Sequence, residues 1–173
     1  MSLWDVIAED AARESPLWAA ALRPTPEREP EPVFSLLGDE RHALGIETIY
    51  EGYLLHYGRP RLFTRHAADE ALLLGDYLYA HGLVRIASLH DAAAVSDLAA
   101  LISVCAQLRA EGAASDGAAW AATSALLGRD GLASARDALR IGRNALPLLD
   151  LARSAAGEDC LRRALAAHDR RVG

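Results

Sequence analysis

The sequence contains no lysine, only two cysteines and few aromatic residues, and each shortage excludes a class of protein. All 18 basic residues are arginines, against 24 acidic residues, and the formal net charge of −6 disfavours binding to nucleic acid or an anionic membrane. Cys105 and Cys160 are too few for a disulfide framework or a cysteine-based zinc site, which fits a reducing compartment. These shortages favour an acidic cytoplasmic protein that has no nucleic-acid partner.

Long apolar runs and a basic leader are also missing. The most apolar stretch runs from Ala71 to Val84, and Asp76 interrupts it before it reaches the roughly 18 residues of a membrane span. Residues 1–10 carry acidic side chains where a signal peptide carries basic ones. We therefore expect no membrane span and no signal peptide.

Alanine and leucine dominate what is present, with 36 Ala and 28 Leu among 173 residues. Both residues rank high in helix propensity, whereas strands favour β-branched and aromatic residues. The length suits one domain with a core of its own. The composition predicts an all-α fold, a helical bundle of about six to eight helices.

Proline separates an N-terminal arm from the rest of the chain. Ser2 is placed to cap a first helix, and Ser15-Pro16 to start a short second one. Four of the seven prolines fall within residues 23–33, which favours an extended, solvated connector. We expect residues 1–33 to form an arm and connector, and residues 34–173 to form the helical bundle.

Hydrophobic periodicity and glycine stop signals place the helices of the bundle. The predicted helices are Asp39–Tyr57, Thr64–Leu89, Asp91–Arg109, Asp116–Leu127 and two within Leu132–Arg171, separated near Gly157. Pro147 is expected to kink or shorten the first of the two helices within Leu132–Arg171. Residues 71–84 are apolar on nearly all sides, which predicts a helix surrounded by other helices.

Charged side chains interrupt the helical pattern in the part of the chain where the Tyr and Phe residues gather, residues 34–79. Glu47 and Glu51 share one helix face, and Asp76 lies alone among apolar residues, where an arginine would be its ordinary partner. Arg41, Arg59, Arg61 and Arg85 are available as such partners. The aromatic residues either line a pocket or fill the core unevenly. The candidate ligand-binding residues are Glu47, Glu51, Tyr53, His56, Arg59, Arg61, Asp69, Asp76 and Tyr79.

Several catalytic patterns are missing from the sequence. A di-iron bundle needs Glu-x-x-His pairs, and neither His56 nor His66 stands in that order after a glutamate. No G-x-S-x-G elbow, P-loop or glycine-rich dinucleotide fingerprint occurs. Cys105 lies on an apolar helical stripe and is expected to be a buried small hydrophobe. We expect no metal, no cofactor and no catalytic residue.

Two segments resemble trans-isoprenyl (polyprenyl) diphosphate synthases. Residues 58–63, Gly-Arg-Pro-Arg-Leu-Phe, match the family's R-R-G-x-P turn, and residues 67–80, with Gly75-Asp76, match its helix A-x-L-x-G-D-x-L-x-x-A. Val95–Gly112 and the tail around Leu146-Pro147 and residues 161–171 are similar to later helices of that family. The resemblance implies an isoprenoid-synthase-like helical fold around a deep apolar tube.

The chain departs from that family in the motifs that carry the family's catalytic residues. The sequence has no Asp-Asp pair, so both aspartate-rich motifs that hold Mg²⁺ are missing, and His56-Tyr57 replaces the arginine pair before Gly58. Magnesium on a diphosphate needs several oxygen ligands, and Glu47 and Glu51 are too few. Prenyl transfer by this chain alone is therefore not expected.

Three functional hypotheses follow. The first is a non-catalytic isoprenoid-synthase-like protein that forms homo-oligomers, or hetero-oligomers with a helical partner, as an accessory subunit of a prenyl synthase. The second is an enzyme or carrier that binds a hydrophobic or prenyl-type ligand in an aromatic-lined pocket. The third is a helical domain whose family likeness reflects Ala/Leu composition.

Overall fold

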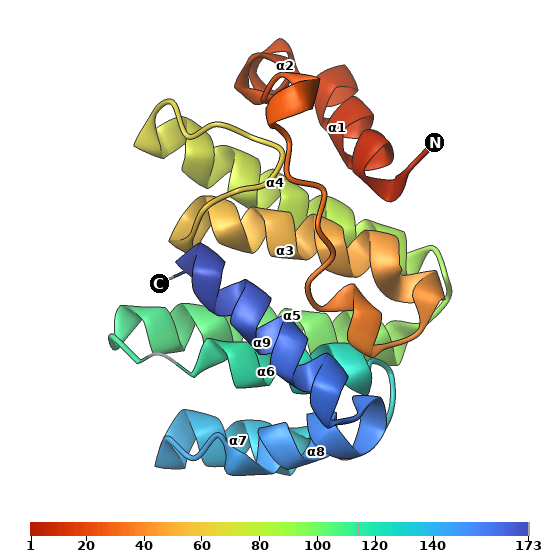
Figure 1. Ribbon diagram of the computed structural model, residues 1–173, viewed down its shortest axis with the longest axis vertical. Coiled ribbons are helices and arrows are strands. Elements are labelled where there is room, and N and C mark those ends of the chain that lie inside the picture. Colours follow the sequence, from red (N-terminus) through yellow and green to blue (C-terminus); the bar gives the residue numbers. More distant parts are fainter. Residues whose placement is uncertain (114, 173) are drawn as a thin grey trace.

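The computed structural model describes residues 1–113 and 115–172, and this part of the chain is all-α, as the composition predicted. Its α-helices are α1 (Leu3–Glu14), α2 (Pro16–Ala21), α3 (Ala43–Tyr57), α4 (Ala68–Ala87), α5 (Ala92–Ala110), α6 (Asp116–Ala125), α7 (Leu132–Gly142), α8 (Leu146–Ala156) and α9 (Glu158–Val172). Figure 1 shows α1 and α2 at one end, α3 and α4 next, α5 and α6 below them, and α7 and α8 at the far end. Helix α9 packs against α6, α8 and α3.

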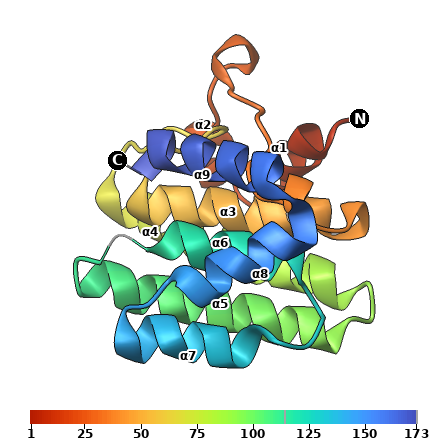
Figure 2. The same cartoon turned by 60° about the horizontal axis from the view of Figure 1, so that its bottom comes forward.

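The N-terminal helices begin where their capping residues predict. Ser2 accepts a hydrogen bond from the backbone of Asp5, whose carboxylate binds Ser2 in return, and the Ser15 side chain caps α2. Both helices pack on α3 and α4 through an apolar cluster that is separate from the main core and includes Ile7 and Phe63. The connector makes a 3₁₀ turn at Thr25–Glu27, which protrudes at the top of Figure 2.

Helices α3 and α4 cross closely through four glycines. A Cβ at Gly52 would lie 2.8 Å from the carbonyl oxygen of Gly75, and a Cβ at Gly82 would lie 3.1 Å from that of Gly45. These glycines are spaced seven residues apart on each helix, so they recur on one face. The missing side chains allow the two backbones to touch, and the helices then pack without a gap at the crossing.

Two predictions for α4 were wrong. The helix begins at Ala68 rather than Thr64, and it has no side-chain cap at Ala67. It is also not surrounded by other helices, because Leu73 and Val84 are 56% and 63% exposed. The glycine face of α4 packs on α3, while large apolar side chains on the other face meet solvent, so a uniformly apolar sequence did not indicate burial on all sides.

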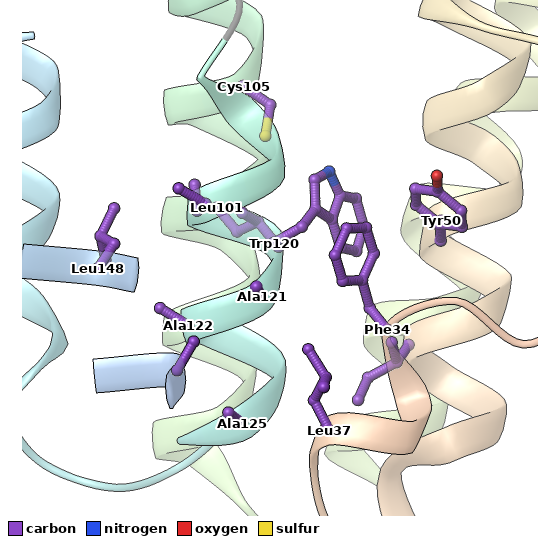
Figure 3. Packing of buried hydrophobic residues seen from close by; sticks show 14 of the residues in the cluster. Phe34, Leu37, Tyr50, Leu101, Cys105, Trp120, Ala121, Ala122, Ala125 and Leu148 are labelled. Atoms are coloured by element: carbon purple, nitrogen blue, oxygen red, sulfur yellow. The ribbon is translucent and has the colours of Figure 1, made fainter. Parts of the chain in front are cut away.

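The main core contains a cluster of aromatic rings between α3 and α6. Trp120 stacks on Phe34 with ring centroids 5.6 Å apart, and Tyr50 meets both rings edge-on (Figure 3). All three side chains are fully buried, as is Cys105, for which burial was predicted. The concentration of aromatic residues in residues 34–79 therefore fills part of the core, where Ala-rich α6 leaves space for large rings.

The C-terminal region contains three helices instead of the predicted two. Pro147 lies in the first turn of α8, where its missing N–H has no intrahelical role, so it starts a helix rather than kinking one. Arg143, at φ 55°, ends α7 in the left-handed conformation, and the Asn144 side chain accepts a hydrogen bond from the backbone of Leu146. The break predicted near Gly157 is confirmed.

Candidate functional site

Three of the predicted site residues form a buried ionic cluster, which we call the Glu47–Arg61–Glu51 cluster. Arg61 donates from Nη1 to Glu47 Oε2 at 2.5 Å and from Nε to Glu51 Oε2 at 2.8 Å. None of the three side chains has exposed surface. The ring of Trp4 covers the guanidinium at 4.6 Å, which seals the cluster from the arm side.

Backbone groups satisfy the remaining carboxylate oxygens of this cluster. Glu47 Oε1 accepts from the backbone N–H groups of Val33 and Ser35, and Glu51 Oε1 accepts from those of Arg61 and Leu62. Burial would lower the pKa of Arg61, but the two carboxylates outweigh it and raise that pKa. These bonds hold the connector and the loop before α4 against α3. The cluster therefore has a structural role in joining these three segments.

Asp76 has a different partner from the one that its sequence context suggested. Its carboxylate is 64% exposed and lies 3.2 Å from His56 Nε2, so the expected arginine partner is wrong. His56 also stacks on Tyr79, with ring centroids 5.0 Å apart. Burial lowers the pKa of His56 more than the nearby Asp76 raises it, so this histidine favours its neutral form.

The nine predicted residues therefore lie in separate places. Arg59 is exposed near Glu29 at 3.7 Å, and Asp69 is exposed in the first turn of α4. Tyr53 points away from both groups and joins a polar cluster on the other side of α3. The close crossing of α3 and α4 separates these positions, which sequence spacing alone had grouped.

A second buried polar cluster forms where α3, α5, α6 and α9 meet. Tyr53 donates a hydrogen bond from its hydroxyl to Asp116 Oδ2, and Arg109 donates from Nε to the same oxygen at 2.6 Å. Arg109 Nη2 also donates to the Tyr53 hydroxyl at 2.7 Å. On α9, His168 places Nδ1 2.9 Å from the Tyr50 hydroxyl and Nε2 3.6 Å from Asp116 Oδ1.

The electrostatics of this cluster favour an ionised aspartate and protonated tyrosines. Burial would raise the pKa of Asp116, but the neighbouring His168, the hydrogen bond from Tyr53 and the charge of Arg109 lower it to about 2. Burial and, in second place, the charge of Asp116 raise the pKa of Tyr53 far above its usual value. Asp116 also lies in the first turn of α6, where the helix dipole favours an anion.

A cavity of about 410 Å³, which we call the α6 cleft, adjoins this cluster. Its lining includes Arg109, Asp116, Gly117, Leu149, Leu165 and His168. Its volume lies within the range of small-molecule sites. Within the polar cluster, Tyr53 had been predicted as a site residue but Asp116 and His168 had not, because these two lie 52 residues apart and only tertiary packing brings them together.

Besides the α6 cleft, the outer face of α5 is a second surface that could contact another molecule. The helix is long and apolar enough to cross a membrane by length and composition, with mean hydropathy 1.4, which the sequence analysis did not anticipate. Only 33% of its most apolar window is buried. The helix packs on α4, α6 and α7, so it also belongs to the helical body.

The side chains of the described residues form no group of three or more His, Cys, Asp or Glu that could hold a metal ion. Comparison of the chain with protein-family models, with curated proteins and with solved structures finds no match.

Proposed function

We propose that this protein is a non-catalytic helical protein that acts by association, and that its first partner is a second copy of the same chain. One observation carries the proposal: among the described helices α5 is long and apolar enough to span a membrane, yet only 33% of its apolar window is buried. Exposed apolar surface of this kind marks interaction sites.

The exposed face of α5 is regular as well as apolar. Six small residues are exposed along it at alternating spacings of four and three: Ala92, Ser96, Ala99, Ser103, Ala106 and Ala110. This spacing keeps them on one stripe over the whole helix, and small side chains allow another helix to approach closely. The stripe contains no charged residue, so a partner helix would not need charged side chains that pair with it.

The symmetry of the stripe favours a second copy as the occupant. A twofold axis near the middle of α5 would place Ala99 of one copy beside Ser103 of the other and pair the two ends of the stripe. Antiparallel packing of this type already occurs within the chain, where α3 and α4 cross on small residues. A membrane is the less favoured occupant, because Asp97 on the same helix pairs with Arg136 of α7.

The likeness to trans-isoprenyl diphosphate synthases extends the proposal. We propose an isoprenoid-synthase-like relation for the fold and the role of an accessory subunit, supported by the Gly75-Asp76 helix and by the absence of aspartate pairs in the sequence. A prenyl synthase would then be the partner in a hetero-oligomer. The free thiols of Cys105 and Cys160 support a cytoplasmic location.

The experiment compares three proteins by size-exclusion chromatography with light scattering. The wild type is expected to be a dimer, and Ala99→Arg is expected to be a monomer, because pairing would bury two unpaired guanidinium groups. Ala166→Arg on α9 is the matched control, since it adds the same charge at an exposed alanine in mid-helix. It is expected to leave the dimer intact.

A monomeric wild type at high concentration would contradict self-association. Dissociation by both arginine variants would also contradict it, because the effect would then come from charge rather than from the α5 face. If the wild type instead floats with neutral phospholipid vesicles and Ala99→Arg does not, the face binds a membrane and the proposal is wrong.

A further inference from the structure

We propose that the association surface extends from α5 onto the outer face of α4, where Leu73 of one copy packs against Val84 of the other. This inference rests on the proposed association of two copies through α5, and it adds the large apolar contacts that the small residues of α5 cannot supply. Figure 2 shows α4 and α5 as neighbouring helices joined by a short turn.

The stripe on α5 is by itself too small for a stable interface. A standard interface takes about 20–30 residues and about 800 Å² of surface from each partner. The stripe contributes six small side chains from a single helix. A second copy seated on α5 must therefore also cover a neighbouring helix, and α4 packs directly on α5.

The outer face of α4 carries the apolar side chains that such an extension needs. Leu72, Leu73 and Val84 are each more than half exposed, and Leu89 in the turn after α4 is 40% exposed. Among the described residues, no other helix carries more than one exposed large apolar side chain. A concentration of this kind marks an interaction surface, whereas single exposed apolar residues do not.

The exposed faces of α4 and α5 lie on the same side of the molecule. Helix α4 is covered by α3, which packs on its glycine face, and α5 is covered by α6. In Figure 1 both covering helices lie in front of the helices that they cover. The exposed faces of α4 and α5 therefore both point away from α3 and α6, so one partner can contact both faces at once.

The middle of α4 lies level with the middle of α5. A turn of four residues, 88–91, joins the end of α4 at Ala87 to the start of α5 at Ala92. The two helices run in opposite directions with the same rise per residue. Counting nine residues on from Ala92 reaches the middle of the stripe, and counting nine back from Ala87 reaches Leu78. A twofold axis across the middle of α5 therefore crosses α4 near Leu78.

This axis brings Leu73 of one copy opposite Val84 of the other. The two residues lie five positions before and six positions after Leu78, and their spacing of eleven, about three turns, places them on one flank of the helix. The contact then occurs twice, as an isologous interface requires. Asp76 falls opposite Ala80 of the other copy and keeps its own partner His56 at 3.2 Å, so the pairing opposes no like charges directly.

The test is a charge-exchange cycle in the full chain, with the dimer Kd measured by analytical ultracentrifugation. Leu73→Glu and Val84→Arg should each raise the Kd about tenfold or more, because each buries an unpaired charge in the interface. The double variant Leu73→Glu/Val84→Arg should recover most of that loss, since each glutamate then meets an arginine of the other copy.

The matched control is Leu36→Glu, which places the same charge at an exposed leucine in the turn Ser35–Leu37. That turn packs on α3, α6, α8 and α9, and the variant should leave the Kd unchanged. Weakening by Leu36→Glu to the same extent would overturn the inference, because added charge alone would then explain the effect.

The outcomes separate this inference from the association through α5. If Ala99→Arg is monomeric but the α4 variants keep the Kd of the wild type, the extension onto α4 is wrong and the α5 contact stands. A monomeric wild type contradicts both. Weakening by both single variants without recovery in the double variant would show that Leu73 and Val84 do not face each other. Flotation of the wild type with neutral phospholipid vesicles that Leu73→Glu abolishes would assign the face to a membrane and overturn the inference.

Discussion

Replacing Gly52 with alanine should destabilise the protein, although alanine is the better helix former. Alanine in a helix interior is favoured over glycine by up to about 1 kcal/mol. The new methyl group would lie 2.8 Å from the carbonyl oxygen of Gly75 and 3.1 Å from the Tyr79 ring. The oxygen belongs to the backbone of α4 and cannot turn away, so α3 and α4 must separate.

Overpacking of this kind costs about 1–3 kcal/mol, and the gain in helix propensity offsets part of it. We therefore expect a net loss of about 1–2 kcal/mol, which for a slope of about 2 kcal/mol/M lowers the urea midpoint by about 0.5–1 M. Urea unfolding followed by circular dichroism measures this midpoint.

Two other glycines supply the controls. Gly142→Ala in α7 places its methyl group in open space and should leave the midpoint unchanged or raise it. Gly45→Ala should also lower the midpoint, because its methyl group would lie 2.5 and 2.6 Å from Cδ1 and Cγ1 of the buried Ile86 side chain. If Gly52→Ala proves as stable as Gly142→Ala, the close crossing of α3 and α4 is refuted.

Three further predictions concern charged groups. Arg61→Met should cost about 3–5 kcal/mol in chemical denaturation, because Glu47 and Glu51 would be left buried without their cation. Adding Glu47→Gln and Glu51→Gln to that variant should restore part of the loss, and no recovery would show that the carboxylates are not the cause. Asp76→Asn should change stability by less than about 0.5 kcal/mol, since the side chain is 64% exposed, and a larger change would assign the residue a structural role. Because the folded pKa of Asp116 is about 2, below the usual aspartate value of 3.8, its contribution of about 2 kcal/mol should be present above pH 4 and disappear as the pH falls through 2. Thermal unfolding of the wild type between pH 5 and 2 should show this slope and Asp116→Asn should lack it, whereas equal slopes would contradict the assignment.

Local signals predicted the helices where the responsible residues are neighbours in sequence. The predicted cap at Ser2 and the predicted end of α3 at Tyr57 were correct, because each signal acts within a turn of its own helix. Pro147 was misread for the same reason: proline either ends a helix or begins one, and its effect depends on the Arg143 turn before it. A helix boundary can thus be predicted from sequence only where the boundary residue has a single local role, as Ser2 does and Pro147 does not.

The candidate site was much less predictable. Glu47 and Glu51 were correctly placed on one helix face, but their partner Arg61 and their complete burial depend on the loop before α4 folding back onto α3. The pairing of Asp116 with His168 has no signal in sequence spacing, since the two residues belong to different helices.

The sequence by itself determined that this chain is helical, acidic and free of paired aspartates, because those properties depend on composition and on contacts within a turn or two of a helix. Tertiary structure alone decided which polar groups are buried together and which apolar face stays exposed. The physical reason is that burial and pairing depend on how closely helices distant in sequence approach each other. In this protein four glycines set that distance between α3 and α4, and the packing of α9 on α6 brings His168 to Asp116.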